Sequence, residues 1–267
     1  MGELFYSGRH IRVESFPNGV KKLIFSRPDI RNAFHAEMIS EITTALNNLT
    51  TISDILNMRL LILEGEGKVF SAGADLNYMK EQSKNTQEQN LQDARHLGNM
   101  FFQLASFPTP VVCAVKGAAI GGGLGLTTCA DFVLCEENTI FCTSEVLLGL
   151  IPAVISPYII RKVGLAQASF FMLSGSKMNA QDAFNFKLAN RITTESNFNT
   201  ELDNVAKQFL CAGPYAARKT KELILNCAPL PQPALFEYCA AQIAAVRSGE
   251  EAQQGLNSFF SKKEVSW

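Results

Sequence analysis

The chain has 267 residues, of which 47% are hydrophobic and 18% are charged, so it can bury a sizeable core and is not intrinsically disordered. Its 24 basic and 25 acidic residues leave a formal charge of −1, which argues against the basic surface of a nucleic-acid-binding protein. The most apolar stretch, residues 146–160, contains two prolines and is shorter than the roughly 20 residues that span a bilayer. We therefore expect a cytoplasmic protein that binds neither membranes nor nucleic acid.

The cysteines and histidines predict neither disulfides nor a metal site. Seven cysteines lack CxxC spacing, and most lie in apolar sequence, which favours buried free thiols. His10, His35 and His96 are far apart in the sequence and belong to no HExxH motif or obvious serine-histidine triad. We expect them to be surface or packing residues, and we expect no metal ion.

The first part of the chain alternates strand and helix patterns. Runs 11–16 and 20–25 are separated by Pro17-Asn18-Gly19, a turn composition typical of a β-hairpin. A helical period then places Met38, Ile42, Ala45 and Leu46 on one face. The apolar run 60–63 predicts a buried strand.

A polar, glutamine-rich stretch follows at residues 81–92. It has no core-facing pattern, so we expect a mobile loop there. The next helix carries its apolar face at Ala94, Leu97, Phe101 and Leu104. Residues 110–115 predict a second buried strand.

The second half of the chain is expected to be mostly helical. A helix N-terminus is predicted near Gly122, and short strands are predicted at 132–135 and 140–142. From about Ser156 onward the pattern is helical throughout, with helix starts near Asn179, Asn199, Gly213 and Pro233.

Two segments of small residues indicate a ligand site. Phe70-Ser71-Ala72-Gly73-Ala74-Asp75-Leu76 follows a strand and exposes backbone N–H groups to close approach, although it also fits a tight turn. Residues 116–126 (KGAAIGGGLGL) begin a helix among glycines, so the positive end of the helix dipole faces whatever lies in front. Close helix packing alone also selects such glycines.

Taken with residues 144–152 (SEVLLGLIP) and 259–263 (FFSKK), these segments resemble the crotonase (enoyl-CoA hydratase/isomerase) superfamily over nearly the whole chain. Residues 71–80 and 144–160 are most similar to the bacterial methylglutaconyl-CoA hydratase branch. The resemblance implies an α/β crotonase (ClpP-like) fold. A spiral of strand-strand-helix turns would form an acyl-CoA-binding core over 1–197, and a C-terminal helical region over 198–267 would serve trimerisation, as a homotrimer or a dimer of trimers.

The resemblance also implies how the thioester is activated. Crotonases stabilise a thioester enolate with two backbone N–H groups, which by position are those of Ala72 and Gly122. Losing one such donor typically costs about 3–4 kcal/mol of transition-state stabilisation. Gly122 has no Cβ, so the thioester is expected to approach it closely.

Only one of the family's two catalytic glutamates is present. Glu145 fits the second, whereas Gly125, 20 residues earlier, stands where the first is expected. The apolar residues that follow Glu145 predict a raised carboxyl pKa, suited to a general acid and base. An ion-pair or helix-start role for Glu145 is the alternative. Candidates to compensate for the missing glutamate are Tyr78, Ser144 and Thr127, among which the sequence does not choose.

The resemblance places coenzyme A, which is part of the substrate and not a separate cofactor, against one group of residues: Arg31, Ala33, Ala72, Gly73, Ala74, Asp75, Leu76, Gly122 and, near the phosphates and often from a neighbouring subunit, Lys262. Asp75 alternatively caps the next helix. Arg27, Arg31, Lys262 and Lys263 offer local positive charge to a polyanionic carrier. Lys80 is a candidate to meet a carboxylate at the far end of the acyl group.

The first expectation for function is therefore hydration of a 2-enoyl-CoA, with a methylglutaconyl-type substrate favoured. Isomerisation of an enoyl-CoA is the second, because isomerases of the superfamily work with a single carboxylate. The third is a non-catalytic homologue that binds an acyl-CoA or RNA.

Overall fold

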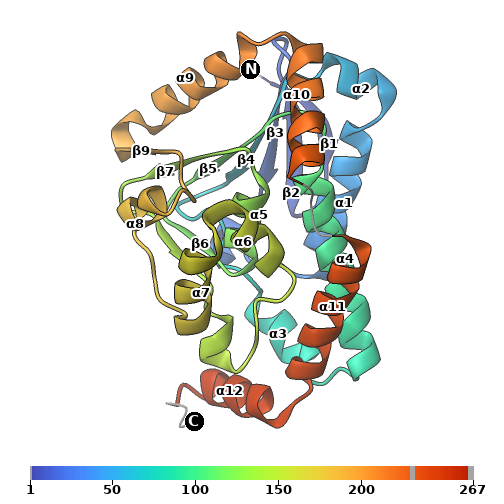
Figure 1. The fold of residues 1–267 in the computed structure, drawn as a ribbon, viewed down its shortest axis with the longest axis vertical. Helices are drawn as coiled ribbons and strands as arrows, with labels where there is room; N and C mark the ends of the chain where they lie inside the picture. The colour runs from blue at the N-terminus through green and yellow to red at the C-terminus, as the bar shows by residue number, and fades with distance from the viewer. Residues whose placement is uncertain (1, 229–231, 264–267) are drawn as a thin grey trace.

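The computed structural model describes residues 2–228 and 232–263, and it contains a seven-stranded mixed sheet (Figure 1). The strands of this sheet, in their spatial order, are β1 (Glu3–Ser7), β2 (Ile11–Ser15), β3 (Val20–Phe25), β4 (Leu60–Gly65), β5 (Val111–Val115), β7 (Phe132–Glu136) and β9 (Arg191–Thr193). The first three strands pair antiparallel, and every later pair is parallel. A separate parallel pair joins β6 (Ala118–Ile120) to β8 (Ile140–Cys142).

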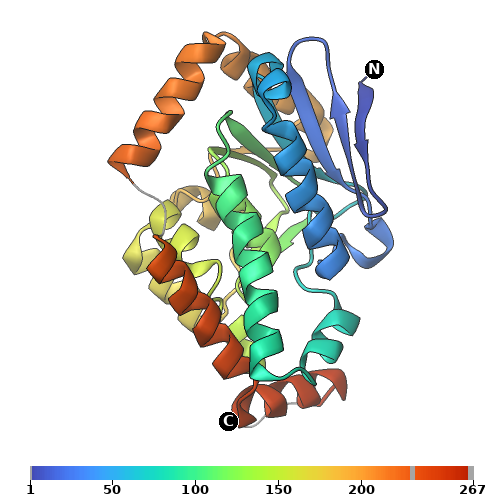
Figure 2. The same cartoon turned by 90° about the vertical axis from the view of Figure 1, so that its right-hand side faces the viewer.

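Helices cover both faces of the large sheet and extend beyond it. They are α1 (Ala36–Leu49), α2 (Ile52–Asn57), α3 (Leu76–Gln82), α4 (Gln87–Ala105), α5 (Gly122–Cys129), α6 (Ser156–Val163), α7 (Leu165–Ser174), α8 (Ala180–Asn185), α9 (Phe198–Leu210), α10 (Pro214–Cys227), α11 (Pro233–Arg247) and α12 (Glu250–Phe260). Short 3-10 helices are η1 (Pro28–Ile30), η2 (Glu145–Leu148) and η3 (Glu195–Asn197). Figure 2 shows α1, α4 and α11 side by side.

The alternation of side chains along the strands divides the core between two layers. On β4, Leu61 and Leu63 face the main core, which α1, α4 and α5 cover, whereas Leu60 and Ile62 face a second cluster under α9. Successive side chains of a strand point to opposite faces, so an uninterrupted apolar run is what a strand covered on both sides requires. The predicted α/β class and the predicted hairpin are confirmed.

Helix α11 lies close along α4 because a glycine permits it. An ideal Cβ at Gly98 of α4 would lie 2.1 Å from Cε2 of Phe236 on α11. Helix α9 covers one face of the sheet. The proposed division at residue 197 therefore separates segments that share packing contacts in the described residues, and its last four positions, 264–267, lie outside them.

The expectation of a mobile loop at residues 81–92 is wrong. Helix α3 continues to Gln82, and α4 begins at Gln87 with a capping box in which Thr86 and Gln89 bond each other's backbone N–H groups. Most polar side chains of this stretch are exposed, and the two that are buried, Gln82 and Asn90, bond polar groups of residues outside the stretch. Asn90, for example, is 1% exposed and donates to the Ser248 hydroxyl at 3.2 Å.

Other elements differ from the sequence expectations. Strand β9 interrupts the region expected to be helical throughout, and β1, β6 and α2 had no predicted counterpart. Of the seven cysteines, five are buried thiols, whereas Cys211 and Cys227 are exposed. The helix starts expected at Gly122, Asn179, Asn199, Gly213 and Pro233 agree with the structure to within one residue.

In the described part of the chain no helix is long and apolar enough to cross a membrane.

Candidate active site

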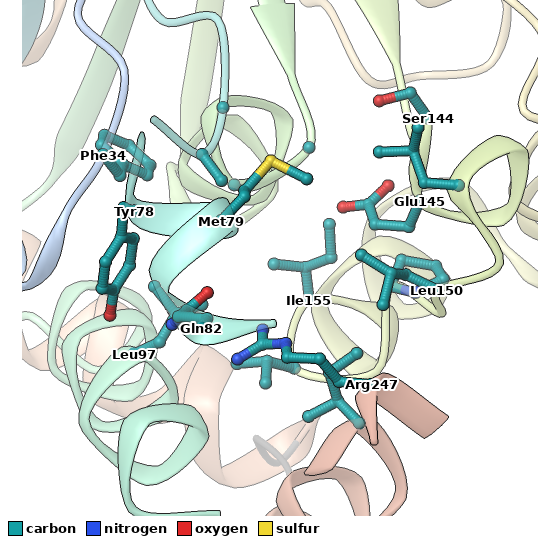
Figure 3. A pocket seen from close by; sticks show the side chains of 18 of the residues that line it. Phe34, Tyr78, Met79, Gln82, Leu97, Ser144, Glu145, Leu150, Ile155 and Arg247 are labelled. Carbon is teal, nitrogen blue, oxygen red and sulfur yellow. The ribbon is translucent and has the colours of Figure 1, made fainter. Parts of the chain in front are cut away.

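A cavity of about 450 Å³ lies between the end of the small sheet and the helices α3, α4, α11 and α12 (Figure 3). Its walls are mainly aliphatic, and the polar side chains on them gather at two places. Glu145 and Ser144 lie at one side, and Tyr78, Gln82 and Arg247 at the other, where all three bond Asp93. The cavity thus has an apolar middle between two polar ends.

Three chain segments converge on the Glu145 end because they run parallel to one another. β6 pairs with β8, and Ser71 forms a bridge with Ala119 of β6. The segment 71–74, the turn after β6 and the turn after β8 therefore leave the small sheet at the same end. The Gly121 N–H donates to the Cys142 carbonyl at 2.8 Å and ties the start of α5 to the strand that precedes Glu145.

The amide predicted at Ala72 already has a partner. The Ala72 N–H donates to the Arg31 carbonyl at 2.9 Å, so in this arrangement it is not available to a ligand. The cause is a strand-like pairing of residues 31–34 with 72–75, in which Phe34 also donates to the Gly73 carbonyl at 2.7 Å. Two residues on, the Ala74 N–H has no hydrogen-bond partner among the described residues, and Ala74 lines the cavity.

The Gly122 amide has no hydrogen-bond partner within the described residues, for the reason that the sequence indicated. Gly122 is the first residue of α5, and the first N–H groups of a helix have no partner within it. An ideal Cβ at Gly122 would lie 3.0 Å from the ring of Phe34, so the glycine accommodates that ring. At Gly121 the backbone has a φ of 51°, and an ideal Cβ would lie 3.1 Å from Glu145 Oε1. Glycine is required there by both backbone and space.

Glu145 places an unpartnered carboxylate oxygen in this apolar surrounding. Its Oε2 is buried and has no hydrogen-bond partner in the part of the chain that the structure describes. Burial raises the pKa of the Glu145 carboxyl to about 7, against a smaller opposing effect of a hydrogen bond from a backbone N–H. Such a group both accepts and returns a proton near neutral pH.

The position of the missing glutamate is filled by hydrocarbon. An ideal Cβ at Gly125 would lie 2.4 Å from Cγ2 of Ile155 and 2.9 Å from Cε1 of Phe101. Both of these side chains are almost fully buried. A side chain at residue 125 therefore has no room unless its neighbours move, and Ile155 presents an aliphatic surface to the cavity in its place.

The three candidates to assist Glu145 lie in different places in the structure. The Thr127 hydroxyl is buried and donates to the Leu124 carbonyl at 2.7 Å, and Thr127 is not among the cavity-lining residues. The Tyr78 hydroxyl donates to Asp93 on the far side of the cavity. Ser144 lines the cavity next to Glu145 (Figure 3). Of the three candidates left open, Thr127 therefore does not face the cavity, and Ser144 is the one next to Glu145.

The far end of the cavity is a polar network that the sequence did not indicate. The Asp93 carboxylate accepts from the Tyr78 hydroxyl, from Gln82 Nε2 and from Arg247 Nη1, the last at 3.2 Å. These groups come from α3, α4 and α11, and Arg247 lies 154 residues from Asp93 in the chain. Burial, and secondarily Asp93, raises the pKa of the Tyr78 hydroxyl, so it stays protonated. Lys80, the residue predicted to meet a carboxylate at the far end of the acyl group, is exposed and does not line the cavity.

The residues predicted to bind coenzyme A divide into two sets. Ala72, Gly73, Ala74, Leu76 and Gly122 line the cavity, whereas Arg31, Ala33, Asp75 and Lys262 do not. Asp75 caps α3 by accepting from the Asn77 N–H at 2.9 Å. This is the helix-capping role that the sequence predicts as the alternative to coenzyme A binding. Arg27 is also engaged, because it bonds the Ala33 carbonyl at 2.6 Å and pairs with Asp75 at 3.0 Å.

Two histidines that are distant in sequence lie close together near Arg27. The rings of His10 and His35 lie 4.4 Å apart, and His10 Nε2 lies 2.9 Å from Glu37 Oε2, so the three residues form a cluster of metal-ligand type. His35 also accepts from the Met38 N–H as the N-cap of α1. Arg27 Nη1 lies 3.2 Å from His35 Nδ1, and this positive charge opposes a second cation. The cluster therefore fixes the start of α1.

Comparison with known proteins gives a consistent result. The family model described as enoyl-CoA hydratase/isomerase matches residues 15–267. A protein of Mycosarcoma maydis named enoyl-CoA isomerase/hydratase fer4 is 32% identical over 252 residues, covering 92% of this chain and 91% of that protein. The rat enoyl-CoA delta isomerase 2 is 29% identical over 92% of this chain and 62% of its own length.

The fold agrees with solved structures of similar sequence. The crystal structure of an enoyl-CoA hydratase from Shewanella pealeana superposes with a TM-score of 0.77 at 35% identity, covering 97% of this chain and 96% of that one. The match extends through the C-terminal helices, so the whole α/β architecture is shared.

Proposed function

The chain belongs to the enoyl-CoA hydratase/isomerase family, and from that premise we propose that it adds water to a 2-enoyl-CoA with Glu145 as the single acid and base. The observation that carries the proposal is the Glu145 carboxyl in an apolar cavity, with a pKa of about 7 and with Oε2 unpartnered among the described residues, beside the N-terminus of α5. The walls around this carboxyl are mainly aliphatic, and a low local dielectric constant strengthens electrostatic interactions.

Each step has a group to perform it. The Glu145 carboxylate takes a proton from a water molecule, and the resulting hydroxide adds to the β-carbon. The electron pair of the double bond moves to the thioester oxygen as an enolate, which the Gly122 and Ala74 N–H groups stabilise. Protonated Glu145 then returns its proton to the α-carbon, the thioester re-forms, and the carboxylate is restored.

The proposed substrate is a branched 2-enoyl-CoA of the methylglutaconyl type. Support comes from the similarity of residues 71–80 and 144–160 to that branch, and from the aliphatic middle of the cavity between two polar ends. The test is to incubate the purified protein with 3-methylglutaconyl-CoA and with crotonyl-CoA in water labelled with heavy oxygen. Loss of enoyl-thioester absorbance with uptake of the label is expected, and no hydration of either substrate would overturn the proposal.

A separate experiment tests whether the Ala74 N–H, and not the Ala72 N–H, stabilises the enolate. Replacing an alanine by lactic acid converts its amide to an ester and removes the N–H without changing the side chain. At residue 74 we expect kcat to fall about 100- to 1,000-fold. At residue 72 the same replacement removes only the bond to the Arg31 carbonyl, and it serves as the matched control. A larger loss at 72 than at 74 would restore the original assignment.

Isomerisation of a 3-enoyl-CoA is a second candidate, which one observation favours. Ile155 and Phe101 occupy the place of a second carboxylate, and moving one proton between two carbons needs only one. The same labelled-water experiment separates the two reactions. An isomerase converts a 3-enoyl-CoA to the 2-enoyl form with no uptake of heavy oxygen.

We further propose that the chain assembles as a homotrimer or a dimer of trimers in the cytoplasm, as the family resemblance implies. Large apolar side chains support this because they are exposed on one stretch of helix, with Leu165 70% and Leu173 80% exposed on α7. Lys262, outside the cavity lining of its own chain, would then reach the phosphates of a carrier bound to a neighbour. Light scattering during gel filtration tests the assembly, and a monomeric mass would exclude it.

A further inference from the structure

We propose that Arg247 selects acyl-CoA substrates that end in a carboxylate, by holding that carboxylate at the end of the cavity opposite Glu145. The proposal deepens the hydration proposed above and rests on it for the direction in which the acyl group lies. It assigns Arg247 as a specificity-determining residue.

The first argument is the position of the guanidinium. Arg247 is the last residue of α11, and its side chain, 14% exposed, lines the cavity. Figure 3 shows Arg247 and Glu145 on different sides of the same space, with the guanidinium directed into it. Among the described residues that line the cavity, Arg247 is the one basic residue.

The second argument is the unused donor edge. Nη1 of Arg247 bonds Asn90 Oδ1 at 3.4 Å and Asp93 Oδ2 at 3.2 Å. Nε and Nη2 have no hydrogen-bond partner within residues 2–228 and 232–263, and neither is among the buried unsatisfied atoms. The Nε and Nη2 groups form the side-on fork that binds a carboxylate through two parallel hydrogen bonds.

The third argument is that Asp93 and Asn90 hold the Arg247 guanidinium in place. They do so without neutralising all of its positive charge. Asp93 also accepts from the Tyr78 hydroxyl and from Gln82, so its negative charge has two neutral donors besides Arg247. Asn90 is held in turn by Ser248. A guanidinium whose Nη1 is held by two helix side chains presents its other edge in one orientation, so little conformational entropy is lost on binding a ligand.

The test uses ligands that differ by one carboxylate and undergo no reaction. Glutaryl-CoA is butyryl-CoA with a carboxylate added to the far carbon, so their affinities, measured by calorimetry, isolate the effect of that group. We expect the native protein to prefer glutaryl-CoA by about tenfold or more. Arg247→Met is expected to erase the preference, and Arg247→Lys, which keeps the charge without the fork, to retain part of it.

A matched control comes from the same pair of helices. Arg95 of α4 pairs with Glu237 of α11 at 2.7 Å on the outer surface, away from the cavity lining. Arg95→Met removes an α4–α11 ion pair as Arg247→Met does, and it is expected to leave the glutaryl preference intact. Thermal melts of all variants identify any that do not fold, in which case Arg247→Lys carries the comparison.

Turnover then connects the binding preference to the reaction. For 3-methylglutaconyl-CoA we expect Arg247→Met to raise KM about 30- to 100-fold with a smaller change in kcat, as for an interaction made equally in ground and transition states. For 3-methylcrotonyl-CoA, which has the branch but no carboxylate, the change in KM should be at least tenfold smaller.

The outcomes distinguish the two proposals. No preference for glutaryl-CoA in the native protein, or a preference that survives Arg247→Met, overturns the role of Arg247. A preference that Arg247→Met erases supports that role even if neither enoyl-CoA is hydrated, and in that case only the proposed reaction fails.

Discussion

Two carboxylates line the same cavity and differ in almost every respect. Glu145 has an oxygen with no partner and stands on backbone turns that short parallel strands fix in place. Asp93 accepts from three donors and stands on a long helix. A carboxylate without partners keeps its lone pairs for a proton, whereas one whose lone pairs are occupied holds other side chains. The contrast assigns chemistry to one end and recognition to the other.

The two ends of the cavity also differ in how the backbone builds them. At the Glu145 end the backbone uses small residues, because Gly121 has a φ of 51° and a Cβ at Gly125 would require Ile155 to move. At the Asp93 end, side chains from α3, α4 and α11 do the work, so ordinary helices suffice. In the function proposed above, the main chain sets the reaction geometry and side chains set the choice of substrate.

The largest expected effect is the loss of turnover in Glu145→Gln. The amide cannot accept and return a proton, so we expect kcat to fall about 1,000- to 10,000-fold. Affinity for a saturated acyl-CoA should change less than threefold, because Gln preserves size and the N–H donors remain. Glu137→Gln, at an exposed position, is the control. Full activity in Glu145→Gln would exclude the acid-base role of this end of the cavity.

The next effect concerns the site of the missing glutamate. Gly125→Glu forces a side chain against Ile155 and Phe101 and buries a carboxyl group, which should lower the free energy of unfolding by about 3–5 kcal/mol. Adding Ile155→Ala provides space and should recover part of this loss in urea denaturation. If Gly125→Glu is as stable as the native chain, the site is less tightly filled than the structure indicates.

The pH dependence of stability gives a third, smaller effect. The pKa of Glu145 is about 7 in the folded chain and 4.5 ordinarily, so between these values the folded state holds a proton that the unfolded state releases. Stability therefore falls as pH rises through this window, by about 3 kcal/mol at most. Glu145→Gln removes this titration, and its gain in melting temperature over the native chain should be larger at pH 8 than at pH 5. An equal gain at both pH values would contradict the raised pKa.

The smallest effect is expected at the far end. Asp93→Asn leaves the size of the side chain unchanged but removes the charge that pairs with Arg247, and it should cost about 1–2 kcal/mol of stability. Denaturation in urea measures this loss. The comparison of the two ends predicts that the pH dependence attributed to Glu145 persists in Asp93→Asn, and its disappearance would contradict that attribution.

Much of the Glu145 end was predictable because the signal there is local. A run of glycines after a strand indicates a helix N-terminus, and an acid within an apolar run indicates a raised pKa. The amide assignment failed at Ala72 for a non-local reason. Whether an N–H is free depends on its partner, and that partner is the Arg31 carbonyl, 41 residues earlier in the chain.

By itself the sequence determined the α/β class, the helix start at Gly122, the position of Glu145 and the absence of a carboxylate at Gly125. Only the tertiary structure decided that Ile155 fills the place of that carboxylate, that residues 87–92 are helical, and that Arg247 reaches the cavity. The physical reason is the range of the interactions. Periodicity and turn chemistry act within a few residues, whereas Asn90 on α4 is buried because the end of α11 returns to lie beside it.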